Sequence, residues 1–167
     1  MAAKSQNGKD KQSAFREVTV NKKAYGNFEL IERFEAGLEL LGSEVKSLRA
    51  AQADLTGSYA RVENSQCWLV GAKIAQYQTD PGGIVGHEPA RKRKLLLHKS
   101  EIRRIRTKLE QRGFTLVPLR IYFSNRGFAK IEVALAKGKR QYDKRRTIAE
   151  QQQKRDVDRD MRRYRKR

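Results

Sequence analysis

The sequence predicts a mainly β protein, built as a small antiparallel barrel with two to three short helices and a basic, disordered C-terminal tail. Residues 28–40 alternate between apolar and polar side chains, a period typical of a long, half-buried strand. Two further pairs of β-rich segments are each interrupted by a short turn signal. The last 29 residues carry thirteen basic and five acidic side chains and few apolar ones.

The long strand is expected to bend. Gly37 lies inside it, and a glycine within a strand allows a bulge or a sharp bend. A short helix from Gly42 to Arg49 follows, with Ser43 as its N-cap. The apolar parity of the strand consists of Phe28, Leu30, Phe34, Ala36, Leu38 and Leu40.

The later elements follow from local patterns. Asn64-Ser65 and Ser124–Gly127 are hairpin turns. Ile102, Ile105 and Leu109 form the buried stripe of a helix that Gly113 ends. In chain order, the expected elements are strands at Tyr59–Glu63 and Cys67–Tyr77, a loop from Asp80 to about Lys94, a helix from about Lys99 to Arg112, and strands at Thr115–Phe123 and Phe128–Ala136.

Five or so antiparallel strands, the first of them bent, suit a small closed barrel, and the oligonucleotide-binding barrel (OB-fold) is the leading candidate. We expect a disordered N-terminal arm at 1–20, the barrel at 21–138 and a basic tail at 139–167. The tail buries too little apolar surface to offset its ordering entropy, so by itself it should be disordered.

The formal charge of +19 points to a polyanionic partner, with nucleic acid favoured over an anionic membrane. No apolar run approaches the ~18 residues of a membrane span, and the N-terminus lacks a signal peptide's apolar stretch, so we expect a cytoplasmic protein without a membrane partner. The single cysteine, Cys67, abuts Trp68 in an apolar run and is expected in the core. With His87 and His98 as the two histidines, no metal site and no cofactor are expected.

Catalytic signals are poor. The chain lacks the nucleophile-elbow, phosphate-loop and zinc-helix motifs, and its clustered glutamates fit a solvated strand face, so we expect no enzyme. Three basic runs lie at the ends of predicted elements: Lys22-Lys23, Arg91–Lys94 and Lys137–Arg140. A charge run is usually a solvated face, but three such runs in so basic a protein favour phosphate contacts.

Two blocks, Phe34–Leu38 and Gly42–Arg49, resemble the signature of small protein B, the bacterial tmRNA-binding (SsrA-binding) family. Arg93–His98, Ala136–Lys139 and Tyr142–Arg145 resemble the family's other blocks, in its order. The resemblance implies an oligonucleotide-binding barrel without catalytic activity. It also implies binding to the tRNA-like domain of tmRNA and delivery of that RNA to stalled ribosomes for trans-translation.

Three residues match family positions tied to tmRNA contact: Glu35, Leu96 and Lys130. Lys130 should point outward and can meet a phosphate. Glu35 either accepts from base or ribose donors or forms a surface ion pair, and Leu96 is either a core residue or a contact. The full predicted tmRNA-binding set is Lys22, Lys23, Glu35, Lys94, Leu96, Lys130, Lys137 and Lys139.

The resemblance implies a second site in the tail. The residues that would lie in the decoding centre of the small ribosomal subunit are Tyr142, Asp143, Lys144 and Arg145. The segment beyond them, with Val157 and Met161 at helical spacing, would become a helix in the empty mRNA channel. Barrel and tmRNA together would mimic a tRNA, delivered by elongation factor Tu with alanyl-tmRNA.

Two other functions are compatible with the composition. A structural ribosomal protein or general RNA chaperone would bind many RNAs with little preference and a steep salt dependence. An RNA-processing enzyme would need a paired acid and base that the sequence does not offer. The signature blocks favour the tmRNA adaptor over both.

Overall fold

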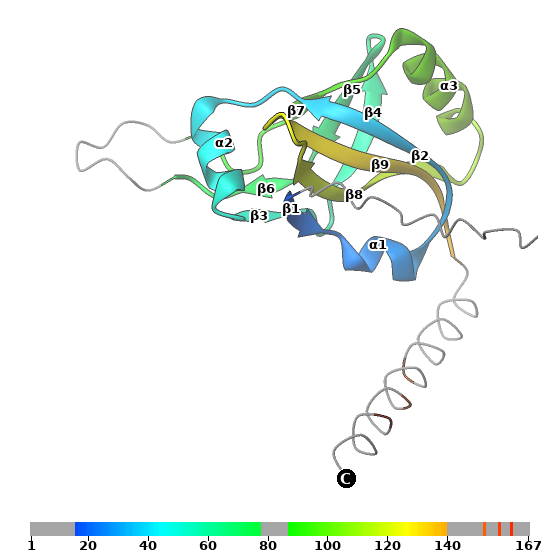
Figure 1. The fold of residues 1–167 in the computed structure, drawn as a ribbon. Helices are drawn as coiled ribbons and strands as arrows, with labels where there is room; N and C mark the ends of the chain where they lie inside the picture. The colour runs from blue at the N-terminus through cyan, green and yellow to red at the C-terminus, as the bar shows by residue number, and fades with distance from the viewer. Residues whose placement is uncertain (1–15, 78–86, 140–151, 153–156, 158–160, 162–167) are drawn as a thin grey trace, which may run out of the picture.

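The computed structural model describes residues 16–77 and 87–139, together with Gln152, Val157 and Met161 (Figure 1). The described elements are β1 (Arg16–Val20), α1 (Lys22–Asn27), β2 (Phe28–Leu38), α2 (Gly42–Arg49), β3 (Ala53–Asp54), β4 (Tyr59–Glu63), β5 (Gln66–Val70), β6 (Lys73–Ile74), β7 (Arg93–Leu96), α3 (Lys99–Leu109), β8 (Phe114–Phe123) and β9 (Ala129–Gly138).

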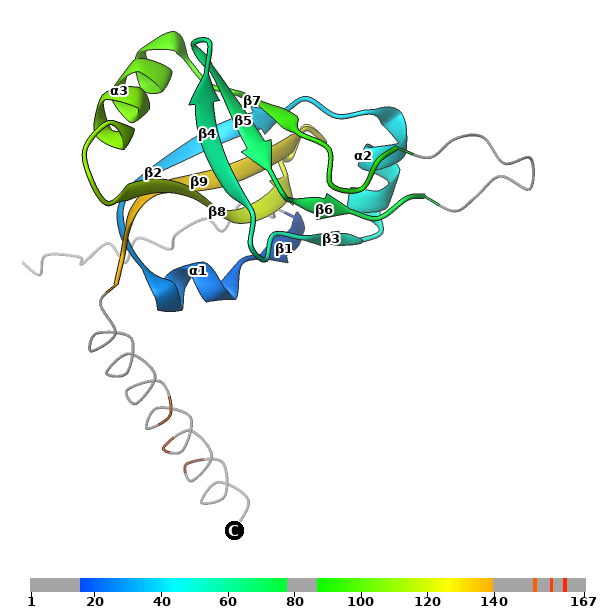
Figure 2. The same ribbon diagram turned by 180° about the vertical axis from the view of Figure 1, so that it is seen from behind.

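The main sheet closes on itself. Its strands run in the order β1-β8-β4-β5-β7-β2-β9, and β9 also pairs with β8, so that the ring is complete. All of these pairings are antiparallel. Strands β2 and β9 lie on one wall of the barrel, and the β4–β5 hairpin crosses the opposite wall (Figure 2). The predicted mainly β barrel is therefore confirmed.

Strand β2 bends at a different residue from the one expected. Its register against β9 shifts between Leu30 and Glu32, which places a bulge at Ile31 rather than at Gly37. Before the bulge, Phe28 and Leu30 pack with α1 outside the barrel, whereas Phe34 beyond it points into the core. Gly37 instead allows β2 and β7 to lie close together, because a Cβ at this position would lie 3.3 Å from the Cβ of Leu96 on β7.

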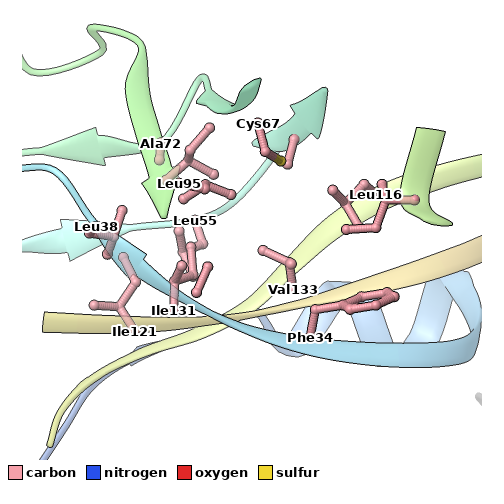
Figure 3. Close-up of a cluster of buried hydrophobic side chains, with 14 of the residues drawn as sticks. Phe34, Leu38, Leu55, Cys67, Ala72, Leu95, Leu116, Ile121, Ile131 and Val133 are labelled. Atoms are coloured by element: carbon pink, nitrogen blue, oxygen red, sulfur yellow. The ribbon is translucent and has the colours of Figure 1, made fainter. Parts of the chain in front are cut away.

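The core fills the barrel with side chains from facing strands (Figure 3). Cys67 is fully buried in it, as expected, and burial raises the pKa of its thiol to about 12. The thiol is therefore protonated at neutral pH and acts as a small apolar side chain. The labelled core residues are Phe34, Leu38, Leu55, Cys67, Ala72, Leu95, Leu116, Ile121, Ile131 and Val133.

Both expected helices form, with changes at their ends. The N-cap of α2 is Leu41, not Ser43: the Leu41 amide donates to Glu44 Oε2 at 2.7 Å. The Ser43 hydroxyl instead bonds Nδ1 of His87 at 2.9 Å. Helix α3 ends at Leu109 rather than Arg112, and its stripe of Ile102, Ile105 and Leu109 faces the barrel as predicted.

Three expected boundaries are corrected. The strand expected at Cys67–Tyr77 breaks at Gly71, where φ is +75°, into β5 and β6. The loop expected up to Lys94 ends earlier, because β7 begins at Arg93. The N-terminal arm expected at 1–20 includes β1, which pairs with β8, so the sheet begins at Arg16. Residues 1–15 and nearly all of the expected tail lie outside the described residues.

A buried ionic cluster fastens α2 to β7. Glu44, fully buried, accepts from Arg91 Nε at 2.8 Å and Nη2 at 2.5 Å, and from Arg93 Nε at 2.8 Å. Burial opposes ionisation of Glu44, but hydrogen bonds from Arg91 and Leu41 and the charge of Arg93 outweigh it and hold the pKa of Glu44 below 4.5. Arg91 and Arg93 are therefore structural, which corrects the interpretation of the whole 91–94 run as phosphate contacts.

Replacing Glu44 with glutamine should destabilise the fold by about 3–5 kcal/mol, because the fully buried Arg93 would lose its counter-charge. Denaturant unfolding measures this loss. A matched control is Glu110→Gln, whose pair with Arg106 is exposed on both sides and worth about 0.5 kcal/mol or less. Equal, small losses in both variants would contradict the structural role of Glu44.

The same cluster sets a pH dependence. Because the pKa of Glu44 is lowered in the folded state, its contribution is present above the ordinary value of 4.5 and is lost as the pH falls through the folded pKa. The free energy of unfolding of the wild type should therefore fall below pH ~4.5 more steeply than that of Glu44→Gln. Parallel pH profiles of the two proteins would contradict this assignment.

Candidate nucleic-acid interface

Three adjacent strands bring Glu35, Tyr122 and Lys130 together on the outer wall of the barrel. Lys130 Nζ on β9 lies 2.7 Å from Oε1 of Glu35 on β2. The hydroxyl of Tyr122 on β8 donates a short hydrogen bond to the other oxygen of the same carboxylate. The strand register fixes this arrangement, because Lys130 stands opposite Gly37 on one side and Tyr122 on the other.

A second carboxylate continues the row. Glu132 stands opposite Glu35 and accepts from Arg120 Nε at 2.6 Å and from Arg33 Nη1 at 3.2 Å. The Arg120 guanidinium also lies 5.3 Å from the centroid of the Tyr122 ring, a cation–π distance. The six side chains form what we call the β2–β9 charge ladder: Arg33, Glu35, Arg120, Tyr122, Lys130 and Glu132.

The ladder holds its groups in defined protonation states. Hydrogen bonds from Lys130 and then Tyr122 keep the pKa of Glu35 below its usual value, although about half of its side chain is exposed. Burial and the hydrogen bond to Glu35 raise the pKa of Tyr122 well above its usual value. At neutral pH the wall therefore presents an ionised carboxylate and an ammonium group in fixed positions, which suits hydrogen bonding to both donors and phosphates of RNA.

Leu96 lies beside the ladder and projects outward. Gly37 pairs with Leu96 on β7 as well as with Lys130 on β9. Leu96 is 53% exposed, whereas Leu95 before it is buried in the core. Of the two alternatives left by the sequence, the structure thus excludes a core residue and places Leu96 on the surface. The three residues that matched family positions, Glu35, Leu96 and Lys130, lie on one continuous surface.

The other predicted lysines lie elsewhere. Lys22 and Lys23 are exposed on α1. Lys137 lies near the end of β9, opposite Glu29 of β2 and with its ammonium group 5.8 Å from the Phe114 ring centroid, and Lys139 follows the strand. Lys139 Nζ donates to the carbonyl oxygen of Tyr25 at 3.3 Å and so links these two segments. We call these four lysines the α1–β9 patch. Lys94 belongs to neither group: it faces Trp68 across β5 and β7.

Sequence reasoning missed the roles of Arg120, Tyr122 and Glu132. A signal was present, because Arg120 and Tyr122 share one parity in the otherwise apolar 115–123 segment, which marks an outward-facing row. The sequence did not show which residues of other strands would lie beside this row. The contact between Tyr122 and Glu35 joins residues 87 positions apart.

The predicted decoding-centre residues, Tyr142, Asp143, Lys144 and Arg145, lie outside the described residues. Val157 and Met161 are helical and exposed. Within the described parts of the chain, no three His, Cys, Asp or Glu side chains gather as metal ligands. None of the helices described there is long and apolar enough to cross a membrane.

A closed antiparallel barrel with cations and an exposed acceptor on its outer wall has the architecture of the oligonucleotide-binding class of proteins. The family model described as "SmpB protein" matches residues 18–163. The chain therefore belongs to the SmpB family.

Individual relatives agree with this assignment. The chain is 46% identical over 162 residues to the SsrA-binding protein of Desulforamulus reducens, covering 97% of each chain. It is 51% identical to that of Thermus thermophilus, covering 77% of this chain and 88% of the relative. It is similar, with a TM-score of 0.63 and 47% identity, to a chain of the structure described as "tmRNA-SmpB: a journey to the center of the bacterial ribosome", covering 78% of this chain and 93% of that one.

Removing either partner of Glu35 should raise the pKa of its carboxyl group. Lys130→Met should raise it more than Tyr122→Phe, because the hydrogen bond from Lys130 is the largest of the causes that lower it. Carboxyl ¹³C NMR titration measures both, with Lys108→Met on α3 as a control that should leave the value in place. An unchanged pKa in Lys130→Met would contradict the ladder geometry.

Proposed function

We propose that this chain binds the tRNA-like domain of tmRNA and delivers it to stalled ribosomes for trans-translation, in which nascent peptides are tagged and ribosomes are rescued. The observation that carries the proposal is the continuous surface of Glu35, Leu96 and Lys130. It occurs in a chain that is 46–51% identical to proteins named SsrA-binding. Membership in this RNA-binding family confirms the expectation that the chain is not an enzyme.

The ladder and Leu96 offer three kinds of contact to RNA on one wall. Lys130 offers donors to a phosphate, and Glu35, ionised at neutral pH, accepts from the exposed amino or hydroxyl groups of bases and riboses. Leu96 supplies an apolar contact on the same wall. Tyr122 and Glu35 hold the ammonium group of Lys130 in place, so that less side-chain freedom is lost on binding.

The α1–β9 patch and the tail form a second part of the proposal. The patch adjoins the basic tail, because Lys137 lies near the end of β9 and Lys139 is the first residue of the tail. In our proposal the tail, residues 139–167, is disordered alone and folds as a helix on the ribosome. Tyr142, Asp143, Lys144 and Arg145 then lie in the decoding centre, and Val157 and Met161 belong to the segment that enters the empty mRNA channel.

Barrel and RNA together would mimic a tRNA, with the protein standing in for the missing anticodon arm. The tail would detect a vacant channel, because intact message would occupy its path. Further partners in this proposal are the small ribosomal subunit and elongation factor Tu with alanyl-tmRNA, in the cytoplasm. A general RNA chaperone remains the competing function, and RNA preference separates the two.

Lys130→Ala should weaken binding to the tRNA-like portion of tmRNA by about tenfold, or ~1.4 kcal/mol. It should also reduce the slope of log K against log salt by about 1, because one phosphate contact is lost. Lys108→Ala, which removes an exposed lysine from α3, is the matched control. The wild type should prefer this RNA over an elongator tRNA by tenfold or more at near-physiological salt.

Equal binding of the wild type to both RNAs would favour the chaperone function. Equal losses in Lys130→Ala and Lys108→Ala would show that net charge, rather than the ladder, determines affinity.

Truncation after Lys139 should leave tmRNA affinity nearly unchanged and abolish peptide tagging, because in this proposal the barrel binds the RNA and the tail acts on the ribosome. The measurements are an RNA titration and a tagging assay on stalled ribosomes with the same truncated protein. A loss of RNA affinity by orders of magnitude would contradict the division of labour between barrel and tail.

A further inference from the structure

A pocket lies on the barrel wall opposite the β2–β9 charge ladder. It has a volume of about 350 Å³, is open to solvent, and is lined by Glu63, Asn64, Gln66, Trp68 and Lys92. The β4–β5 hairpin forms its floor, on the wall that faces the viewer in Figure 2. Its volume falls in the range of roughly 300–1,000 Å³ that is usual for small-ligand sites.

Trp68 is the aromatic surface of this pocket. Cys67 and Leu69 on either side of it are fully buried in the core, so strand alternation directs Trp68 outward. The register places Arg61 of β4 and Lys94 of β7 on either side of Trp68. An indole flanked by cations on a sheet surface is the arrangement on which nucleobases stack in single-strand-binding proteins.

The cations come from the basic run Arg91–Lys94, whose successive side chains point to opposite sides. Arg91 and Arg93 turn inward to the buried Glu44. Lys92 is consequently exposed at the pocket, and Lys94, partly exposed, is the register partner of Trp68. The Glu44 cluster therefore determines which side chains of the run reach the Trp68 wall. The two lysines that it leaves there, Lys92 and Lys94, have no carboxylate partner among the described residues.

The rim provides polar groups for the edge of a base. Asn64 and Ser65 both have positive φ, 48° and 58°, which forms a tight turn and fixes Asn64 at the rim. The carboxylate of Glu63 is an acceptor, and the amide groups of Asn64 and Gln66 both donate and accept. Glu63 also pairs with Arg61 Nη2 at 2.7 Å, and its carboxylate can accept hydrogen bonds but cannot donate them. The exocyclic amino group of adenine or cytosine can therefore donate to it, whereas uracil has a carbonyl oxygen where cytosine has its amino group.

We propose that this pocket binds one unpaired RNA nucleotide. Its base stacks on Trp68, its phosphate meets Lys92 and Lys94, and the rim prefers adenine or cytosine over uracil. The site is distinct from the ladder and rests on the proposed function only in taking RNA as the partner. Strand β7, which pairs with β5 on one side and with β2 on the other, connects it to Leu96.

The chain contains a single tryptophan and six tyrosines, so tryptophan fluorescence excited at wavelengths that tyrosine does not absorb reports on this pocket alone. The full-length protein is titrated with hexanucleotides of A, C and U and with inorganic polyphosphate of matched charge. Stacking predicts quenching by the A and C oligomers, with apparent affinity for the U oligomer several-fold weaker. Polyphosphate, which has no base, should leave the fluorescence unchanged. Quenching by polyphosphate, or by none of the oligomers, would overturn the proposal, and equal affinity for A, C and U would overturn the role of the rim.

Variants separate the pocket from general charge. In fluorescence anisotropy with a labelled A hexanucleotide, Trp68→Ala should weaken binding about fivefold or more, because one stacking contact is lost. Lys92→Ala, which leaves the sheet surface intact, should also weaken it, whereas Lys108→Ala on α3 should weaken it less. If Lys92→Ala and Lys108→Ala behave alike and Trp68→Ala has no effect, the pocket is not a nucleotide site.

The proposed tmRNA function is tested by a separate measurement from the pocket. The loss of affinity for the tRNA-like portion in Lys130→Ala tests the ladder and does not involve Trp68. A failed hexanucleotide titration with that loss intact would overturn the pocket and leave the proposed function standing. If the hexanucleotides quench as expected but the protein shows no preference for tmRNA, the pocket would stand and the proposed function would be overturned.

Discussion

The double pairing of β9 is the constraint on which the rest of the structure depends. It bonds to β8 along one edge and to β2 along the other, and so it both closes the barrel and sets the register of the ladder. A slip of one residue would turn Lys130 and Glu132 inward and Ile131 and Val133 outward, against water. The alternation of residues along β9 therefore buries the core side chains and places the interface side chains at the same time.

Charged side chains have two separate uses in this structure, one buried and one at the surface. Glu44 is fully buried and draws Arg91 and Arg93 into the structure, although burying an ion pair costs desolvation energy. On the wall of β2 and β9, Glu35 and Glu132 instead hold cations at the surface. A charge of +19 does not by itself say which cations are available to RNA. The positions of the carboxylates determine which cations are available, because each carboxylate orients the Lys and Arg side chains that it pairs with.

Local patterns were sufficient to predict most elements. The turn at 124–127, the buried stripe of α3 and the alternation along β2 each arise within a short window, where the period of side chains determines the structure. The same windows did not place the bulge at Ile31. Glu32 interrupts the apolar parity there, but the parity resumes at Phe34 as if the strand were regular, although its even-numbered residues have changed face. The windows also missed β7, whose strand character depends on two partners distant in the sequence.

The sequence singled out Glu35, Leu96 and Lys130 in the candidate interface, but not their arrangement or the partners Arg120, Tyr122 and Glu132. Glu35 and Lys130 lie 95 positions apart, and Arg93 and Glu44 lie 49 apart, so neither contact can be seen in a period or a motif. Closure of the sheet brings these distant residues side by side. It also gives the molecule two outer walls that share no functional side chain and are joined through β7. Because the two walls are fixed by different carboxylates, Glu35 on one and Glu44 behind the other, each can change its side chains without disturbing the other.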